Sequence, residues 1–245
     1  MKCLILAAGY ATRLYPLTEK FPKPLLKIRE KTIIDWLIDD IDTLNVIDEY
    51  IIISNHKYFD HFKSWAKDKK QNVTVLDDGT TSNENRLGAV IDIKFAVDKL
   101  NINDDLLVLA GDNVLDFSLK HFIKYALDKN TSCVMRYYEE STQRLKKSGV
   151  AQIDGNEKII SLEEKPESPK SNWCIPPFYY YKNEDIKKIN LAIADGCKTD
   201  APGSLVGWMC QNSDVYALEM PGKRYDVGSL ESYETIKNNY KGIKG

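Results

Sequence analysis

Cationic side chains on a proline-rich loop are the first residues of this sequence that could do chemistry. The stretch LILAAGYATRLYPLTEKFPKPLL, residues 4–26, begins as an apolar strand, and Gly9 then starts a loop that carries Arg13 and Lys23. Gly9 and Ala11 are small enough for backbone N–H groups to approach a phosphate closely. Arg13 can form forked hydrogen bonds to phosphate oxygens, and Lys23 supplies a point charge. The loop therefore predicts a binding site for a phosphorylated ligand.

A second candidate is Asp112, which leaves an apolar strand in the segment LLVLAGDNV. In open parallel sheets, ligands bind beyond the carboxyl ends of the strands, where both Asp112 and the first loop are expected. A carboxylate that faces a polyphosphate is repelled unless a cation lies between them. Mg²⁺ takes one or two carboxylates together with phosphate oxygens and water, so we expect Asp112 to bind Mg²⁺. The alternatives are that Asp112 only caps a helix or turn, and that Gly9 is only a turn residue.

Strand and helix signals alternate in the part of the chain that must position these residues. Helical patterns follow Thr32, a plausible N-cap with Asp35 three residues later, and separate short apolar runs at residues 3–8, 50–54, 73–76 and 106–111. Such alternation predicts parallel strands joined by helical crossovers. After about residue 130, further strands follow with fewer helices between them, some of them antiparallel. A closing helix starts at Ser229, with Leu230, Tyr233 and Ile236 on its inner face.

The predicted fold class is α/β: one Rossmann-like domain with a mixed, mainly parallel sheet, helices on both faces and an added β elaboration on the substrate side. We expect residues 1–245 to form this single domain. Residues 1–130 would be the nucleotide-binding part, residues 131–228 the part that binds the phosphorylated substrate, and residues 229–240 the closing helix.

Composition excludes several other classes of protein. The chain has 245 residues and a formal net charge of −2, so no broad basic face is expected for nucleic acid. No apolar run approaches the roughly 18 residues that span a bilayer, and the N-terminal run is too short for a signal peptide. The five cysteines are scattered without a C-x-x-C pair, which fits a reduced cytoplasmic protein without zinc or disulfides. Neither G-x-G-x-x-G nor a Walker A sequence occurs.

Five segments, in the same order, resemble those of the NDP-sugar pyrophosphorylases, the nucleotidyltransferases that make nucleotide-sugars. They are LAAGYATRLYPLTEKFPKPLL, AGDNV, SGVAQID, SLEEKPESPKSNWCIPPFYYY and RYDVGSLESY. The fourth segment is most similar to glucose-1-phosphate thymidylyltransferases. The resemblance runs over residues 3–240, so it implies the nucleotide-diphospho-sugar transferase fold for essentially the whole chain.

The resemblance implies that a sugar-1-phosphate oxygen attacks the α-phosphate of a nucleoside triphosphate, with dTTP the first nucleotide to expect, and that pyrophosphate leaves with the help of Mg²⁺. Because the nucleophile is already an anion, no general base is needed, which agrees with the absence of a Ser–His–Asp arrangement. Arg13 would bind the β- and γ-phosphates, and Lys23 would reach the α-phosphate, as the catalytic residues. Asp112 and Asp226 would bind the metal.

The resemblance also implies two groups of binding residues. The nucleotide-binding group is Leu6, Ala7, Ala8, Gly9, Ala11, Thr12, Arg13, Lys23, Gly88 and Asp112. The substrate-binding group is Gly149, Glu164, Lys165 and Tyr180, with Lys165 paired to the sugar phosphate and Glu164 bound to sugar hydroxyls.

Three positions depart from the family pattern. Ala11 stands where a second glycine is usual, which is tolerable if its φ is negative. The loop of residues 78–87 lacks the glutamine that reads the base, and Pro177 replaces a glycine near the sugar. These departures leave two alternatives open: a cytidylyltransferase for a phosphocholine-like acceptor, or a nucleotide- or sugar-sensing subunit without turnover.

The expected partners are a nucleoside triphosphate and a small phosphorylated substrate, without nucleic acid or membrane insertion, and a homo-oligomer is compatible with the sequence. The chain ends soon after the last expected helix, so we expect the catalytic core without a further β-helical domain.

Overall fold

The computed structural model describes residues 1–244, which divide into two compact units. The first unit comprises residues 1–86, residues 110–121 and the segment from Pro221 onward. The second unit comprises residues 87–109 and 122–220. Each unit has its own strands, helices and buried apolar side chains.

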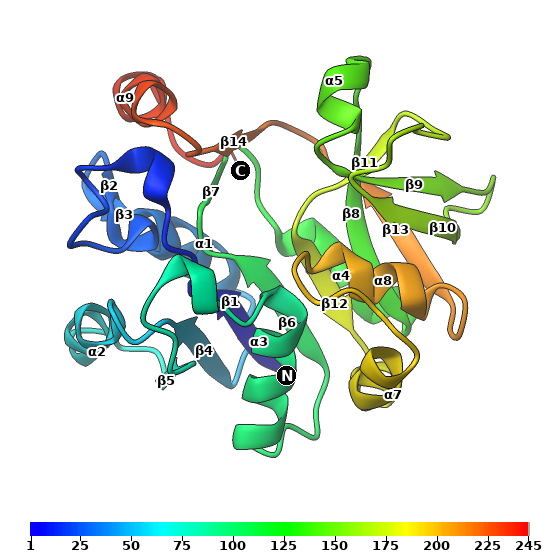
Figure 1. Cartoon of the computed structure of the whole chain (residues 1–245), viewed down its shortest axis with the longest axis horizontal. Helices are drawn as coiled ribbons and strands as arrows, with labels where there is room; N and C mark the ends of the chain where they lie inside the picture. The colour runs from blue at the N-terminus through cyan, green and yellow to red at the C-terminus, as the bar shows by residue number, and fades with distance from the viewer. Residues whose placement is uncertain (245) are drawn as a thin grey trace. The chain divides into compact units, whose positions relative to one another are not determined.

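Three parallel strands form the main sheet of the first unit (Figure 1), in the order β1 (Lys2–Leu6), β4 (Glu49–Ser54) and β5 (Val73–Asp77). Helix α1 (Ile33–Asp42) connects β1 to β4, and helix α2 (Phe59–Lys67) connects β4 to β5. Parallel neighbours require such crossovers, because a tight turn cannot join them. The predicted alternation of strand and helix is confirmed here.

Helix α1 begins where the sequence predicted. The Asp35 backbone N–H donates to the Thr32 hydroxyl at 3.2 Å, and the Thr32 N–H donates to the Asp35 carboxylate at 3.4 Å. This reciprocal pair is a capping box, which satisfies two N–H groups that the first turn leaves unpaired. It fixes the point at which the chain turns from the cationic loop into the helix.

The rest of the first unit consists of short elements and the closing helix. They are the 3₁₀ turns η1 (Thr12–Leu14), η2 (Lys23–Leu25) and η3 (Asn83–Asn85), the paired strands β2 (Lys27–Ile28) and β3 (Lys31–Thr32), the paired strands β7 (Asn113–Leu115) and β14 (Arg224–Asp226), and α9 (Leu230–Asn239).

Helix α9 and the residue that follows it are hydrogen-bonded to strands β2 and β7. The Tyr233 hydroxyl donates to the Lys27 carbonyl at 2.9 Å, and the Tyr240 hydroxyl donates to the Leu115 carbonyl at 2.6 Å. The predicted start at Ser229 is confirmed, and Tyr233 and Ile236 are buried. The prediction for Leu230 is wrong: its side chain is exposed, because the first turn of α9 extends beyond the apolar cluster.

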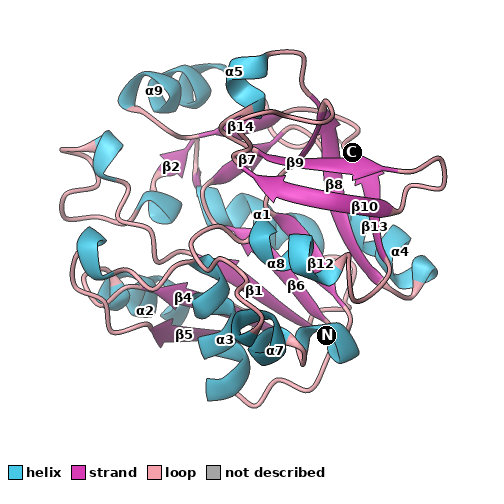
Figure 2. Cartoon of the chain, turned by 45° about the vertical axis from the view of Figure 1, so that its right-hand side comes forward, coloured by secondary structure: helices cyan, strands magenta, loops and turns pink. Residues whose placement is uncertain are grey.

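The second unit contains a mixed sheet (Figure 2) with the strand path β10 (Ile159–Glu164), β9 (Gly149–Ile153), β11 (Trp173–Ile175), β8 (Ser132–Tyr138), β12 (Phe178–Tyr181) and β6 (Leu106–Ala110). These neighbours are antiparallel, whereas β13 (Val215–Glu219) pairs with β8 in parallel. The predicted run CIPPFYYY forms two strands rather than one, because Pro176 and Pro177 lack the N–H groups that continuous pairing requires.

Six helices accompany this sheet in the described part of the chain: α3 (Ala89–Lys99), α4 (Lys120–Lys129), α5 (Thr142–Leu145), α6 (Asn183–Ile186), α7 (Ile189–Ala194) and α8 (Gly203–Met209). Helix α8 packs against β10 and against α7. The predicted mixed sheet with helices and added antiparallel strands after residue 130 is confirmed, whereas the division into functional parts stays a prediction. Within residues 1–244, no helix combines the length and apolar character needed to cross a bilayer.

Candidate active site

Two aspartates that lie far apart in the sequence meet around one lysine in the first unit. The Lys23 Nζ lies 2.8 Å from Oδ2 of Asp112 and 3.6 Å from Oδ1 of Asp226. Asp112 directly precedes β7, Asp226 ends β14, and the antiparallel register places Asp226 opposite Asn113. The paired strands β7 and β14 therefore hold both carboxylates at one end, next to the lysine at the start of η2.

The lysine is the buried member of this group. The side chain of Lys23 is 8% exposed, whereas the side chains of Asp112 and Asp226 are 39% and 51% exposed. Partial burial by itself raises the pKa of Asp112, but the positive charges of Lys23 and Arg224 outweigh this effect and hold the pKa below its ordinary value. Asp112 is therefore an anion at neutral pH, as a metal ligand must be.

The acid pair fits a divalent cation. One ammonium nitrogen contacts both carboxylates, so a single ion can be reached from both. Across residues 1–244, no group of three or more His, Cys, Asp or Glu side chains could hold a metal. An ion bound here would therefore need oxygen ligands from a phosphate and from water, which is the coordination that Mg²⁺ favours.

Arg13 lies on the side of this group where β14 ends. A Cβ atom on Gly228 would lie 3.2 Å from Oδ2 of Asp226 and 3.9 Å from Nη2 of Arg13. The guanidinium itself is exposed. The structure thus brings together Arg13, Lys23, Asp112 and Asp226, the residues that the sequence assigned to phosphate and metal binding.

The backbone of the first loop is fixed at its beginning by neighbouring strands. The Gly111 N–H donates to the Leu6 carbonyl at 3.0 Å, and the Ala7 N–H donates to the Ile53 carbonyl at 2.9 Å. The Asn55 amide donates to the Ala8 carbonyl at 2.8 Å. By contrast, Gly9 is exposed, and a Cβ added to it would meet no atom within 4 Å. The open face of the loop therefore begins at Gly9.

Ala11 does not have the negative φ that we expected. Its φ of 48° and ψ of 41° lie in the left-handed region, where it precedes the turn η1 that contains Thr12. The Ala11 carbonyl accepts the Thr18 hydroxyl at 2.8 Å and the Leu14 N–H at 3.0 Å, which explains how this conformation is held. A glycine would adopt it with less strain.

Glu164 is the centre of a separate group in the second unit. A Cβ on Gly149 would lie 3.0 Å from Glu164 Oε1, and one on Gly203 would lie 2.0 Å from it. Burial raises the pKa of Glu164, although the charge of Lys165 and the Gly203 N–H partly offset that rise. The Glu164 carboxylate therefore fits here only because Gly149 and Gly203 have no side chains.

Lys165 follows Glu164 with a left-handed φ of 51°, and its N–H donates to the Ser148 carbonyl at 2.9 Å. Its Nζ lies 3.9 Å from Asp200, and both side chains are about 60% exposed. This ammonium is thus held only loosely and can meet an anion. The structure groups Gly149, Glu164 and Lys165 as the resemblance implied.

Two predicted binding residues are placed differently. Tyr180 is fully buried and its hydroxyl donates to Asp105, so its side chain is enclosed within the sheet rather than open to a substrate. Gly88 packs against the backbone of residues 199–200, where a Cβ would lie 2.6 Å from the Thr199 carbonyl oxygen. The Thr199 and Asp200 carbonyls also accept the first N–H groups of α3, which leaves those groups unavailable to a nucleotide.

Arg224 and Asn113 form a hydrogen-bonded chain to Asp112, although neither residue was predicted from the sequence. The Arg224 Nη1 donates to Asn113 Oδ1 at 2.6 Å, and the Asn113 amide donates to Asp112 Oδ1 at 2.8 Å. Arg224 could have been found from the alternation of side chains along a strand, which places residues 224 and 226 on the same face.

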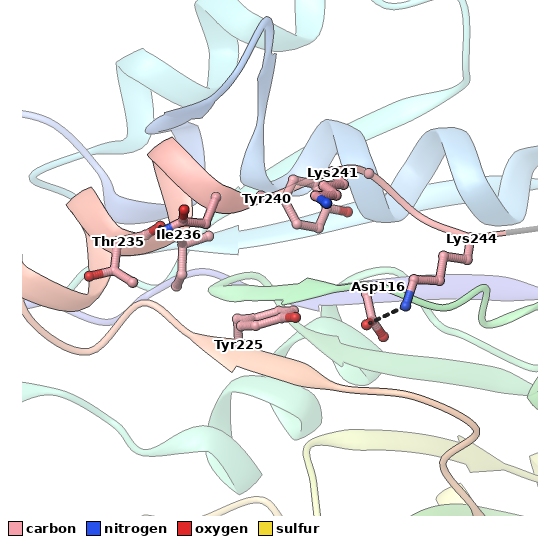
Figure 3. A pocket seen from close by; sticks show the side chains of 9 residues that line it. Asp116, Tyr225, Thr235, Ile236, Tyr240, Lys241 and Lys244 are labelled. Atoms are coloured by element: carbon pink, nitrogen blue, oxygen red, sulfur yellow. Dashed lines mark hydrogen bonds and ion pairs between the residues drawn. The ribbon is translucent and has the colours of Figure 1, made fainter.

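Tyr225, between them, points instead into a cavity of about 220 Å³ beside α9 (Figure 3). Figure 3 also shows the ion pair between Lys244 and Asp116, 3.3 Å apart, at the edge of this cavity. The residues of β14 therefore alternate between the acid pair and the cavity.

Comparison with known proteins gives a consistent result. The family model described as nucleotidyl transferase matches residues 2–242. The glucose-1-phosphate adenylyltransferase of Fervidobacterium nodosum is 29% identical over 244 residues, which cover 94% of this chain. The bifunctional protein GlmU of Methanocaldococcus jannaschii is 34% identical over 93% of this chain. A UDP-glucose pyrophosphorylase solved with UDP-glucose has the same fold, with a TM-score of 0.78 at 20% identity over 98% of this chain and 97% of that one.

The curated relatives are longer than this chain. The matched regions cover 59% of the Fervidobacterium protein and 51% of the Methanocaldococcus protein. The chain thus spans about half to three fifths of the length of these relatives.

Proposed function

Because the chain belongs to the nucleotidyl transferase family, we propose that it transfers a nucleotidyl group from a nucleoside triphosphate to a sugar-1-phosphate and releases pyrophosphate. One observation carries the proposal: a buried lysine joins two carboxylates from distant segments, with Arg13 beside them. That set of charges suits a polyphosphate bound with a cation.

The chain's residues would act by position and charge. The attacking phosphate oxygen is already ionised near neutral pH, so catalysis requires alignment and neutralisation rather than a base. Arg13 would bind the β- and γ-phosphates and the leaving pyrophosphate, and Lys23 would meet the α-phosphate. Asp112 and Asp226 would hold Mg²⁺, which would neutralise charge on the phosphoryl groups.

The second unit supplies residues for the acceptor. Lys165, whose ammonium is exposed, would pair with the phosphate of the sugar, and the Glu164 carboxylate would accept hydrogen bonds from sugar hydroxyls. Gly149 supports this role, because its missing side chain leaves Glu164 its space.

The nucleotide is proposed as dTTP, from the resemblance of the Glu164–Lys165 segment to thymidylyltransferases. The names of the relatives include users of other nucleotides, so the base must be decided by experiment. In the loop of residues 78–87, the Asn85 side chain accepts from the backbone N–H groups of Thr81 and Ser82 at 3.1 and 3.0 Å. Its carbonyl oxygen is thus already used within the loop, and Asn83 Oδ1 likewise accepts from Arg86 Nη1 at 3.4 Å. The Arg86 guanidinium, which has five N–H donors, is therefore the better candidate to read a base.

A panel of dTTP, UTP, CTP, ATP and GTP against sugar-1-phosphates and phosphocholine tests the proposal, with pyrophosphate release in the presence of Mg²⁺ as the measurement. The expected result is pyrophosphate release with at least one sugar-1-phosphate. In the Asp112→Asn variant, turnover should fall by roughly 100-fold or more. Faster release with CTP and phosphocholine than with every sugar-1-phosphate would overturn the acceptor class. Nucleotide binding in calorimetry without release from any pair would overturn the activity itself.

A further inference from the structure

Asp112 is held by two neighbours that bind different oxygens of its carboxylate. Lys23 Nζ contacts Oδ2 at 2.8 Å, whereas the Asn113 amide nitrogen donates to Oδ1 at 2.8 Å. The same amide nitrogen lies 3.3 Å from the Ala110 carbonyl oxygen, which it can also reach as a donor. The direction of the carboxylate is therefore set by Asn113 on one side and by Lys23 on the other.

Arg224 sets the orientation of Asn113 in turn. It lies on β14 diagonally across from Asn113, and its Nη1 donates to Asn113 Oδ1 at 2.6 Å. A flipped amide would place its oxygen against the Asp112 carboxylate and its NH₂ group against the guanidinium, so both contacts would become repulsive. Since Asn113 is 1% exposed, water cannot compensate for such a flip.

We propose that Arg224 and Asn113 are positioning residues for the proposed nucleotidyl transfer: the chain Arg224–Asn113–Asp112 orients the Asp112 carboxylate toward a divalent cation shared with Asp226. The inference rests on the proposed function for its biological meaning, but its physical content is an effect on metal affinity.

The guanidinium has an electrostatic effect as well as a geometric one. It is half-buried and contributes to the positive field that acts on Asp112. Its hydrogen bond to a neutral amide rather than to the carboxylate leaves the oxygens of Asp112 for Lys23, Asn113 and an incoming ion. Outer partners of this kind contribute to metal affinity by fixing the ligand before the ion arrives.

Binding of Mn²⁺ to the full chain, measured by the electron paramagnetic resonance signal of the free ion without any substrate, tests the proposal. In Arg224→Met and Asn113→Leu we expect the dissociation constant for Mn²⁺ to rise about 10- to 100-fold. Arg224→Lys should recover part of the loss, because an ammonium can still donate to Asn113. Arg144→Met makes the same chemical change at a side chain that is 77% exposed, and its affinity should equal that of the unmodified chain.

Kinetics provide a second readout that a purely structural role would not give. For Arg224→Met, raising the Mg²⁺ concentration should restore kcat to within a few-fold of the unmodified enzyme. The kcat of Asp112→Asn should stay low at every Mg²⁺ concentration. If Asn113→Leu does not fold, the Arg224→Met and Arg224→Lys pair decides.

Equal Mn²⁺ affinity in Arg224→Met and the unmodified chain would overturn the proposal, as would equal loss in Arg224→Lys and Arg224→Met. Absence of pyrophosphate release by the unmodified chain would overturn the proposed function instead, since Mn²⁺ binding is measured without turnover.

Discussion

At Gly9, an added methyl group should impair nucleotide binding without affecting the stability of the fold. A Cβ there meets no protein atom within 4 Å, and its backbone does not require the left-handed region. We therefore predict that Gly9→Ala leaves the melting temperature unchanged but raises the KM for the nucleotide about 10-fold or more, because the methyl group would contact the bound phosphates. Steady-state kinetics and calorimetry measure the two quantities.

Gly155→Ala is the matched control for Gly9→Ala, since a Cβ at Gly155 also meets no atom within 4 Å. It should change neither KM nor melting temperature. An unchanged KM in Gly9→Ala would remove Gly9 from the nucleotide site.

The raised pKa of Glu164 makes the stability of the protein depend on pH. Burial raises its pKa above the ordinary value of 4.5, so the folded protein holds this proton more tightly than the unfolded chain does. The free energy of unfolding then falls as pH rises from 4.5 through the raised pKa. We predict that Glu164→Gln raises the melting temperature at about pH 7 and has a smaller effect at about pH 4, because the neutral amide avoids the cost of a buried charge.

Differential scanning calorimetry at both pH values checks this prediction. The control is Glu163→Gln, at the exposed neighbouring position, which should show no such pH dependence. A melting temperature lowered equally at both pH values would mean that Glu164 contributes to stability as a hydrogen-bond partner rather than as a strained anion.

At the level of secondary structure, the residue before turn η1 has a strained backbone that a substitution can relieve. Ala11 precedes it in the left-handed conformation, which costs an L-residue about 1–2 kcal/mol. Ala11→Gly removes that strain but makes the unfolded chain more flexible, so the net gain in unfolding free energy should be at most about 1 kcal/mol. Chemical denaturation of the two proteins measures the difference.

The opposite sign is expected for Ala194→Gly, which makes the same substitution at an exposed position of helix α7. Glycine is less stable than alanine in a helix by about 0.5–1 kcal/mol. Loss of stability in both variants would show that Ala11 is not strained.

The elements also show which parts of the fold could be predicted from the sequence. The starts of α1 and α9 were predictable because a cap is a local interaction between residues three apart, at Thr32 and at Ser229. Strands β7 and β14 were not predicted as strands. Three residues carry no measurable period, and each strand exists only through a partner more than 100 residues away in the chain.

The same limit applied to the candidate site. Asp112, Asp226 and Lys23 were recognised by their types and their sequence motifs, and the structure brings them together. Arg224 could not be assigned in advance, because its contact with Asn113 depends on the register of two strands. Gly88 was assigned to the nucleotide, since nothing in its own segment reveals that the backbone of residues 199–200 covers it.

For the molecule as a whole, we predict that divalent ions serve catalysis rather than folding. Residues 1–244 provide no group of three or more metal-binding side chains, whereas structural metal sites usually have four protein ligands. EDTA should therefore abolish pyrophosphate release without lowering the melting temperature. Mg²⁺ together with the correct nucleotide should raise the melting temperature. When the nucleotide is present at 100 times its dissociation constant, the free energy of unfolding should rise by about 2.7 kcal/mol.

Thermal unfolding scans with EDTA alone, and with Mg²⁺ and nucleotide, test this prediction. Ca²⁺ serves as the control ion, because it takes more oxygen ligands at longer distances and should support turnover poorly. A lower melting temperature in EDTA would reveal a structural metal that the described residues do not account for.

If a divalent ion and a phosphate bind as proposed, the lysine between the two aspartates would make them cooperative ligands. In the absence of both, the ammonium of Lys23 serves as the counter-ion of Asp112 and Asp226. An arriving divalent ion would take over that role and release the ammonium to a phosphate, while a bound phosphate would draw the ammonium away and vacate the acids for the ion. By thermodynamic reciprocity, each would then tighten the binding of the other by the same factor.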